Sequence, residues 1–201
     1  MSMKTMAVLF VLLLVAVVVV VAGCKATRGG YESAPYKVVR RDGKFELRDY
    51  PAFTVVETPM GGGSSNGADG SFNRLFRFIT GGNESKQKIA MTTPVFMSGS
   101  DTNRTMGFVM PAGEKMVQVP KPTDAMVTIR QFEAGRFAVL RYSGRRTAEK
   151  EAEVERRLKS WMEAERVPAK PPPVFGYFDP PWIPAFLRRN EVMLLTASTT
   201  P

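Results

Sequence analysis

The residue types available for chemistry are few in this sequence, which has 201 residues, no histidine and one cysteine, Cys24. Without histidine the chain has no Ser-His-Asp or Cys-His nucleophile and no histidine-ligated metal centre. Carboxylates such as Glu46, Asp49 and Glu57 are present, but they form no recognisable catalytic pair. We therefore expect a binding protein with no catalytic residue and no metal site. An enzyme that acts on small molecules is the less favoured alternative.

Basic and aromatic residues gather on a short helix that we expect to begin at Ser71 and to end before Gly81–Gly82. Apolar residues recur at helical spacing, which predicts a buried face made of Phe72, Leu75, Phe76 and Ile79. Arg74, Arg77 and Phe78 then fall on the outer face. This face is either a solvated basic surface with one exposed aromatic residue, or a platform that stacks a flat apolar ligand while guanidiniums hold its anionic groups. The residues alone favour the solvated surface.

The N-terminus has the pattern of an export signal, because Lys4 precedes an unbroken apolar run over residues 7–22 that small residues end. The run is shorter than the roughly 20 residues that span a bilayer as a helix. Val21-Ala22-Gly23-Cys24 resembles a bacterial lipobox, in which the cysteine is lipidated. We predict a signal peptide over residues 1–23, lipidation of Cys24, a tether over residues 24–35 and one domain over residues 36–201. An uncleaved membrane anchor is the alternative.

Both interpretations place the domain in the cell envelope, on a membrane tether. Lys25 follows the cysteine in place of the aspartate that is associated with inner-membrane retention, which favours the periplasmic face of the outer membrane. The formal charge of +9 favours anionic partners, such as phospholipid headgroups or an anionic small molecule, and nucleic acid is not expected for an exported chain. Since Cys24 is the only cysteine, the domain has no disulfide and depends on its core for stability.

Alternating polar and apolar segments predict an α+β fold. A second helix is expected from Thr147 to about Val167, with Val154, Leu158, Trp161 and Met162 on its buried face. Strands are expected over Tyr36–Arg40, Lys44–Tyr50, Ala52–Glu57, Lys88–Met97, Thr105–Met110, Met126–Phe132, Arg136–Ser143, Val174–Phe178 and Asn190–Thr196. The order strand–strand–helix–strand–strand thus occurs twice, which indicates an internal duplication. Two such halves would form a distorted antiparallel β-barrel of about eight strands carrying two helices.

The segment KIAMTTPVFM, Lys88–Met97, has apolar ends and Thr-Thr-Pro at its centre. A bulge or a sheet edge would accommodate Pro94, and we expect Ile89, Met91, Val95 and Phe96 to line the core or a cleft. The segment resembles the K-I-x-M-T-x-P-V signature of the SOUL haem-binding proteins. Further segments resemble the same family in the same order, over roughly residues 36–197 in all: Phe78–Asn83, Phe108–Pro111, Tyr177–Trp182 and Arg188–Val192.

The resemblance implies a distorted barrel with two helices, built from a duplicated half, that binds haem b or another tetrapyrrole in a shallow apolar cleft. It places Arg77 and Phe78 at the cleft beside the first helix and so favours the platform, with Arg74 and Met91 as further candidates. Arg188 and Arg189 are candidates for the second propionate. Because the chain has no histidine, binding without histidine axial ligation is expected.

The expected function is therefore that of a membrane-tethered tetrapyrrole carrier or scavenger. The alternatives are a binding module for another amphipathic anionic small molecule, a tetrapyrrole-modifying enzyme, and an envelope lipoprotein with a purely structural role.

Overall fold

The computed structural model describes residues 30–61, 69–99, 103–113 and 116–196, together with the exposed helical residues Met6, Phe10 and Leu12. The chain divides into two compact units, Met1–Tyr31 and Glu32–Pro201. Cys24, most of the predicted signal peptide and most of the tether lie outside the described residues, so export and lipidation stay predictions. Among the described residues, no helix has both the length and the apolar character needed to cross a membrane.

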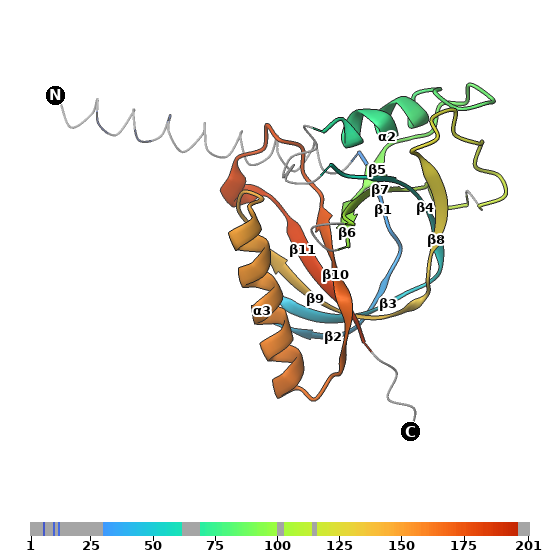
Figure 1. The fold of residues 1–201 in the computed structure, drawn as a ribbon. Helices are drawn as coiled ribbons and strands as arrows, with labels where there is room; N and C mark the ends of the chain where they lie inside the picture. The colour runs from blue at the N-terminus through green and yellow to red at the C-terminus, as the bar shows by residue number, and fades with distance from the viewer. Residues whose placement is uncertain are drawn as a thin grey trace. The chain divides into compact units, whose positions relative to one another are not determined.

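The second unit is an α+β domain built on one large sheet. Nine strands form an antiparallel sheet in the order β2–β3–β9–β11–β10–β6–β7–β4–β8, and two short strands, β1 and β5, form a separate parallel pair (Figure 1). The strands are β1 (Glu32–Ser33), β2 (Lys37–Asp42), β3 (Phe45–Tyr50), β4 (Phe53–Pro59), β5 (Thr92–Thr93), β6 (Val95–Ser98), β7 (Thr105–Val109), β8 (Thr128–Phe132), β9 (Gly135–Tyr142), β10 (Ala169–Tyr177) and β11 (Asn190–Thr196). The described helices are α2 (Ser71–Ile79), α3 (Ala148–Ala164) and the 3₁₀ helix η1 (Ala185–Leu187).

The predicted α+β fold with two helices on an antiparallel sheet is confirmed, but the predicted distorted barrel is wrong, because the sheet stays open between its two end strands. In the described strands, β2 pairs with β3 and β8 pairs with β4, and the two end strands do not pair with each other. Both end strands are largely exposed and carry cations, Lys37, Arg40 and Arg41 on β2 and Arg130 on β8. Charged side chains on exposed edge strands disfavour pairing with a further strand.

The predicted repeat of strand–strand–helix–strand–strand is present in the element order. The first copy is β3–β4–α2–β6–β7, with the short β5 added, and the second copy is β8–β9–α3–β10–β11. The sheet is symmetric about the central β6–β10 pair. Outward from β6 the order is β7, β4, β8, and outward from β10 it is β11, β9, β3, with β2 added at that end. Each copy's first strand pairs with the other copy's second strand, β3 with β9 and β8 with β4. The exchange ties the two halves into one domain.

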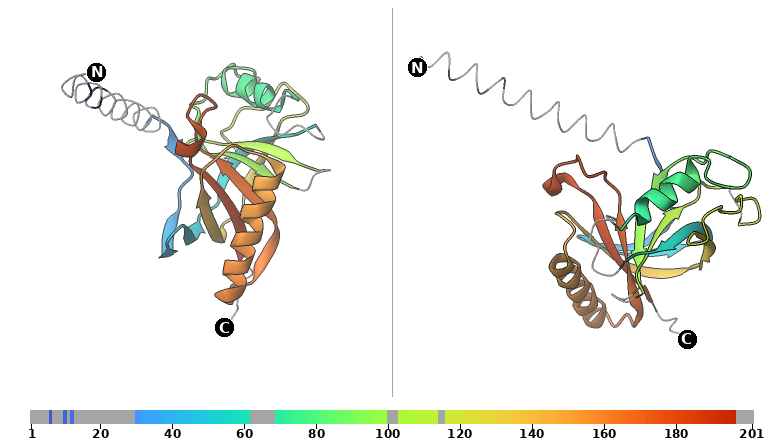
Figure 2. Two further views of the ribbon diagram at one scale, coloured as in Figure 1. Left: turned by 90° about the vertical axis from the view of Figure 1, so that its left-hand side faces the viewer. Right: turned by 45° about the horizontal axis from the view of Figure 1, so that its top comes forward.

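Side chains alternate between the two faces of the sheet, and both faces are packed. One face carries a large apolar core under both helices, to which α3 contributes Val154, Leu158 and Met162. This confirms most of the predicted buried face of α3, while Trp161 is only partly buried and stacks on Phe45 at a centroid distance of 5.1 Å. The other face carries a second cluster that is rich in aromatic residues, among them Tyr50, Phe53, Phe96, Phe132 and Phe137. Figure 2 shows the two helices against the curved sheet from two further sides.

The KIAMTTPVFM segment is divided by Pro94 into β5 and β6. The predicted continuous strand is therefore wrong, because β5 leaves the large sheet and pairs with β1, while β6 pairs with β7 and β10. The core-lining prediction is confirmed for Ile89 and Phe96, which are buried, and Met91 is half-buried against the core under the helices.

Candidate functional site

The face of α2 that points to solvent differs from the predicted one. Its buried residues are Ser71, Leu75, Phe78 and Ile79, so that Phe78 is 1% exposed and belongs to the core. Phe72 and Phe76, predicted to be buried, are 38% and 45% exposed. The prediction of Phe78 as an exposed stacking residue is therefore wrong, and the exposed aromatic residues of this helix are Phe72 and Phe76.

Contacts at the start of α2 fix its rotation about its own axis. Arg74 donates from Nε to the Thr58 hydroxyl at 3.0 Å and from Nη2 to the Pro59 carbonyl at 2.7 Å, which holds this side of the helix against the end of β4. The Ser71 hydroxyl donates to an Asp69 carboxylate oxygen at 2.8 Å. With Arg74 held in this way, Phe78 turns toward the sheet. The guanidinium of Arg74 is committed to the protein itself.

Phe72, Phe76 and Arg77 form an exposed surface that we name the α2 platform. The rings of Phe72 and Phe76 stack with centroids 6.0 Å apart and an interplanar angle of 14°. Phe72 also meets the buried Phe108 of β7 edge-on at 5.3 Å, which anchors the pair to the core. Arg77 is exposed, and the described structure gives its guanidinium one long hydrogen bond, 3.4 Å to the Asn73 carbonyl. The platform therefore offers two exposed phenyl rings and, on the same helix, an accessible cation.

Exposed aromatic residues also occur on the β10–β11 loop, residues 178–189. Trp182 and Phe186 are 73% and 75% exposed. Figures 1 and 2 place this loop and α2 at the same end of the sheet. Arg188 stiffens the loop, because it donates to the carbonyls of Ile183 at 2.8 Å and Pro181 at 2.5 Å. Two groups of exposed rings thus lie at one end of the domain, and Arg188, like Arg74, is committed to main-chain carbonyls.

Arg189 belongs to a buried ionic network on the second face of the sheet. The centre of the network is Arg48, which is fully buried and holds both carboxylate oxygens of Glu191 at 2.7 and 3.0 Å. Arg48 also donates to Glu46 at 2.6 Å and to the Tyr50 hydroxyl at 3.1 Å. Arg189 donates to Glu191 at 2.8 Å, and its guanidinium lies over the Phe178 ring, 3.9 Å from the centroid. This network joins β3 to β11 and was not predicted from the sequence.

The network shifts the ionisation of its members. Burial acts to raise the pKa of Glu191, but the hydrogen bonds and charge of Arg48, with help from Arg189, hold that pKa below its ordinary value. Burial raises the pKa of Tyr50 to about 12, against the opposing effect of the Arg48 charge. Glu191 is therefore ionised and Tyr50 neutral near pH 7. Since Arg189 is bound to Glu191, both C-terminal arginine candidates are engaged within the protein.

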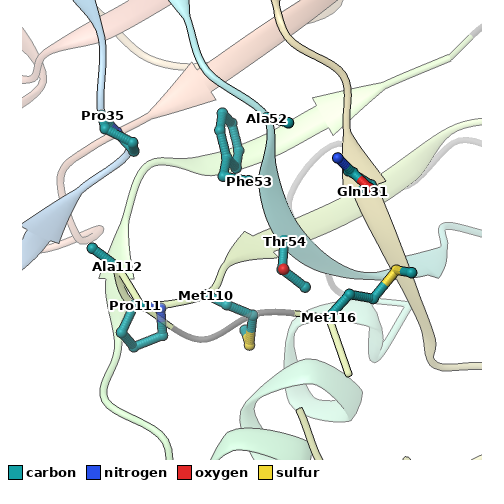
Figure 3. A pocket seen from close by; sticks show the side chains of 10 residues that line it. Pro35, Ala52, Phe53, Thr54, Met110, Pro111, Ala112, Met116 and Gln131 are labelled. Carbon is teal, nitrogen blue, oxygen red and sulfur yellow. The ribbon is translucent and has the colours of Figure 1, made fainter. Parts of the chain in front are cut away.

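A cavity of about 410 Å³ opens between the start of β4, β8 and the segment that follows β7. Figure 3 shows Phe53, Met110, Met116 and Gln131 around it. Its polar lining groups include the Thr54 hydroxyl and the Gln131 amide, and no charged side chain lines it among the described residues. The cavity therefore suits an uncharged group better than a propionate. Sequence reasoning missed it, because its walls come from separate strands.

The described residues contain no cluster of three or more acidic or cysteine side chains that could hold a metal ion. Histidine is absent from the whole sequence. Met91, half-buried against the apolar core, is placed as a packing residue.

Comparison with known proteins identifies the family. The model of the SOUL heme-binding protein family matches residues 31–195. The chain belongs to this family. The SOUL match covers both helices, the nine-stranded sheet and the α2 platform. A comparison of the sequence with curated proteins gives no match.

Solved structures share the fold at low sequence identity. An uncharacterised conserved protein from Listeria innocua is similar with a TM-score of 0.58 and 12% identity over 77% of this chain and 92% of that chain. A hydrolase from Listeria innocua has a TM-score of 0.55 and 12% identity over 79% and 94% of the two chains. EcmrR, in a DNA complex, has a TM-score of 0.58 and 10% identity over 77% of this chain, which spans 57% of EcmrR. At these identities the likeness concerns the fold alone.

Proposed function

We propose that this SOUL-family protein binds haem or a related tetrapyrrole on the α2 platform. The observation that carries the proposal is the exposed stacked pair Phe72–Phe76 beside the exposed Arg77. A tetrapyrrole is flat and apolar with anionic propionates, so its ring matches the phenyl pair and one propionate matches the guanidinium. The β10–β11 loop, which lies at the same end of the sheet and carries the exposed Trp182 and Phe186, would be a further source of apolar contacts.

Binding without histidine ligation follows from the composition. Affinity then comes from apolar burial and from arginine–propionate contacts, and the iron contributes little. The test is a titration of the purified protein with haem and with iron-free protoporphyrin, followed at the Soret band. We expect both ligands to bind with similar affinity. Strong haem binding with no porphyrin binding would refute this mode of binding.

Substitutions on the platform separate specific binding from nonspecific adsorption. Arg77→Glu should lower the affinity for both ligands by roughly tenfold, because it replaces a charge-assisted contact with a propionate by repulsion. Arg156→Glu on α3 is the matched control, since Arg156 is also exposed and also makes a 3.4 Å bond to the carbonyl four residues before it. Phe76→Ser should weaken binding similarly, while Val39→Ser, at a site of 44% exposure, should not. Equal effects at target and control sites would contradict the assignment.

We further propose that the protein acts as a carrier or scavenger attached to the outer membrane through lipidated Cys24. The N-terminal sequence pattern supports this attachment. Mass spectrometry of the protein from membranes tests it, because lipidation adds acyl mass to Cys24, and Cys24→Ser should abolish that added mass. Conversion of a bound tetrapyrrole over time, with release of its metal, would instead favour a tetrapyrrole-modifying enzyme.

A second candidate function rests on the cavity of about 410 Å³. Its apolar lining and its two uncharged polar groups fit a small amphipathic molecule. Native mass spectrometry of the purified protein separates the two candidates. A coloured co-purifying species that Arg77→Glu removes supports the tetrapyrrole, whereas a colourless species that Gln131→Ala removes supports the cavity.

A further inference from the structure

Charged side chains outside the α2 platform meet beside the N-terminus of α3. Glu151 accepts hydrogen bonds from Arg104 Nη2 at 2.5 Å, from Arg146 Nε at 2.9 Å and from the Tyr177 hydroxyl. The side chains of Arg104, Arg146 and Glu151 are 19%, 10% and 8% exposed. The two guanidiniums lie over the rings of Phe175 and Tyr177, at 5.8 and 5.4 Å from the centroids. We name these residues the Glu151 cluster.

The Glu151 cluster holds more donors and more positive charge than its own acceptor can satisfy. Two guanidiniums share one carboxylate, which leaves one positive charge uncompensated in a largely buried place. Arg104 Nε and Arg146 Nη1 are buried and have no hydrogen-bond partner in the described part of the chain. Native proteins rarely leave such donors unpaired, and a buried charge is costly unless it is matched. Among the described residues, the cluster therefore has no second anionic acceptor.

Glu151 cannot fill this need, because its oxygens are already engaged. Burial acts to raise the pKa of Glu151, but the hydrogen bonds from Tyr177, Arg104 and Arg146 lower it below its ordinary value. Burial also raises the pKa of the neighbouring Tyr142 to about 12, so this hydroxyl stays neutral. The missing acceptor has to come from outside these residues.

Chain neighbours of the Glu151 cluster contact both α2 and the β10–β11 loop. Ser71, the first residue of α2, contacts Met106 at 3.7 Å, two residues after Arg104. Gly144, two residues before Arg146, donates its N–H to the Ala185 carbonyl of the β10–β11 loop at 3.0 Å. Residues close to Arg104 and Arg146 in the chain thus contact α2 and the β10–β11 loop, the two elements that carry the exposed aromatic residues.

We propose that the Glu151 cluster is a binding site for the carboxylate of an apolar or aromatic molecule. A single carboxylate matches the one uncompensated charge, and it would accept from Arg104 Nε and Arg146 Nη1. Because the guanidiniums lie over the rings of Phe175 and Tyr177, the surroundings of the bound carboxylate are apolar, which favours an acid with an apolar body. The carboxylate belongs either to a free aryl or fatty acid or to a propionate arm of a tetrapyrrole. The site is defined by its own residues and does not depend on tetrapyrrole binding.

The first test uses 4-phenylbutyrate, with 4-phenylbutanol as the uncharged control, in calorimetric titrations of the purified full chain. We expect the acid to bind and the alcohol not to bind. Arg104→Gln and Arg146→Gln should each lower the affinity for the acid by roughly tenfold or more, because each removes a charge-assisted donor. Arg136→Gln removes an exposed arginine that pairs with Asp49, and should leave the affinity unchanged. Thermal unfolding verifies that each variant is folded.

Glu151→Gln provides a test of opposite sign. It keeps the shape of the side chain but removes the competing carboxylate, so the acid should bind at least as tightly as to the wild type. Failure of the acid to bind, equal binding of the alcohol, unchanged affinity in both arginine variants, or weaker binding to Glu151→Gln would each overturn the proposal.

A second pair of titrations identifies the source of the carboxylate. Mesoporphyrin is compared with its dimethyl ester, in which both propionates are blocked. If Arg146→Gln lowers the affinity for mesoporphyrin but not for its dimethyl ester, the cluster binds a propionate. If it lowers the affinity for phenylbutyrate alone, the ligand is a separate carboxylic acid. A protein that binds phenylbutyrate but no porphyrin supports the carboxylate site and refutes the tetrapyrrole function, so the two proposals fail separately.

Discussion

Replacing Arg48 with methionine should destabilise the domain strongly, because two buried carboxylates then lose their common partner. Glu46 and Glu191 are each 2% exposed, and both accept hydrogen bonds from Arg48. Removing one member of a buried ion pair costs about 3–5 kcal/mol. Arg189 still donates to Glu191 at 2.8 Å, and Arg41 to Glu46 at 2.9 Å, so we expect the lower end, about 3 kcal/mol.

Thermal and urea unfolding measure this loss. For a domain of this size about 3 kcal/mol corresponds to a fall in Tm of roughly 6–12 °C. Arg136→Met is the control, because Arg136 makes a similar bidentate pair with Asp49 but on the surface, where the two side chains are 49% and 44% exposed. Exposed pairs of this kind contribute about 1 kcal/mol or less.

The dependence of stability on pH gives a second readout of the Arg48 network. In the wild type the lowered pKa of Glu191 stabilises the folded state above the ordinary carboxyl value, 4.5, and this contribution is lost as the pH falls through the folded pKa. In Arg48→Met the pKa of the buried Glu191 should instead rise, so protonation stabilises the variant. The difference between the two proteins should be largest near pH 7 and should shrink on acidification toward pH 5. A loss below about 1 kcal/mol, or parallel pH profiles, would refute the reasoning.

Two further predictions concern the helices. Phe78→Ala should cost about 3–5 kcal/mol in unfolding free energy, because Phe78 is 1% exposed in the core, whereas Phe76→Ala should leave stability nearly unchanged and weaken porphyrin binding. Urea unfolding measures the stability of both variants, and porphyrin titration measures their affinity. A large loss of stability in Phe76→Ala and none in Phe78→Ala would instead support the rotation of α2 predicted from the sequence. Thr147→Ala should cost about 1 kcal/mol, since the hydroxyl accepts the Lys150 N–H at 3.2 Å as the cap of α3. Thr147→Ser, which keeps the hydroxyl, should retain most of that stability.

The rotation of α2 shows where local periodicity stops being informative. The predicted stripe and the observed one both contain Leu75 and Ile79 at helical spacing. In a helix of nine residues, the choice between Phe72 and Phe78 as the third large buried residue is not decided by spacing. It is decided in the folded domain, where Phe78 packs into the core and Arg74 bonds to Thr58 and Pro59 of β4. The sequence therefore located the platform on this helix, but it did not identify which aromatic residues are exposed there.

Some features were within reach of the sequence because they depend on neighbours along the chain. The strand periodicity, the helix α3 with its Thr147 cap, and the repeated strand–strand–helix–strand–strand order follow from local alternation, capping and spacing. The absence of histidine limited the chemistry, and the ordered motifs indicated the SOUL family, which the match over residues 31–195 shows. Arg77 was correctly placed at the surface of α2.

Only the tertiary structure decided which distant residues meet. Arg48 and Glu191 are 143 positions apart, and nothing near either residue indicates a bidentate pair with the other. The same holds for Arg104 and Glu151, which come together because β7 and the start of α3 meet in the folded domain. Likewise, the sheet is open because β2 and β8 do not pair, which neither strand's own sequence indicates. The physical reason is common to these cases: local spacing determines which face of an element a side chain occupies, whereas pairing depends on which elements the folded core brings into contact.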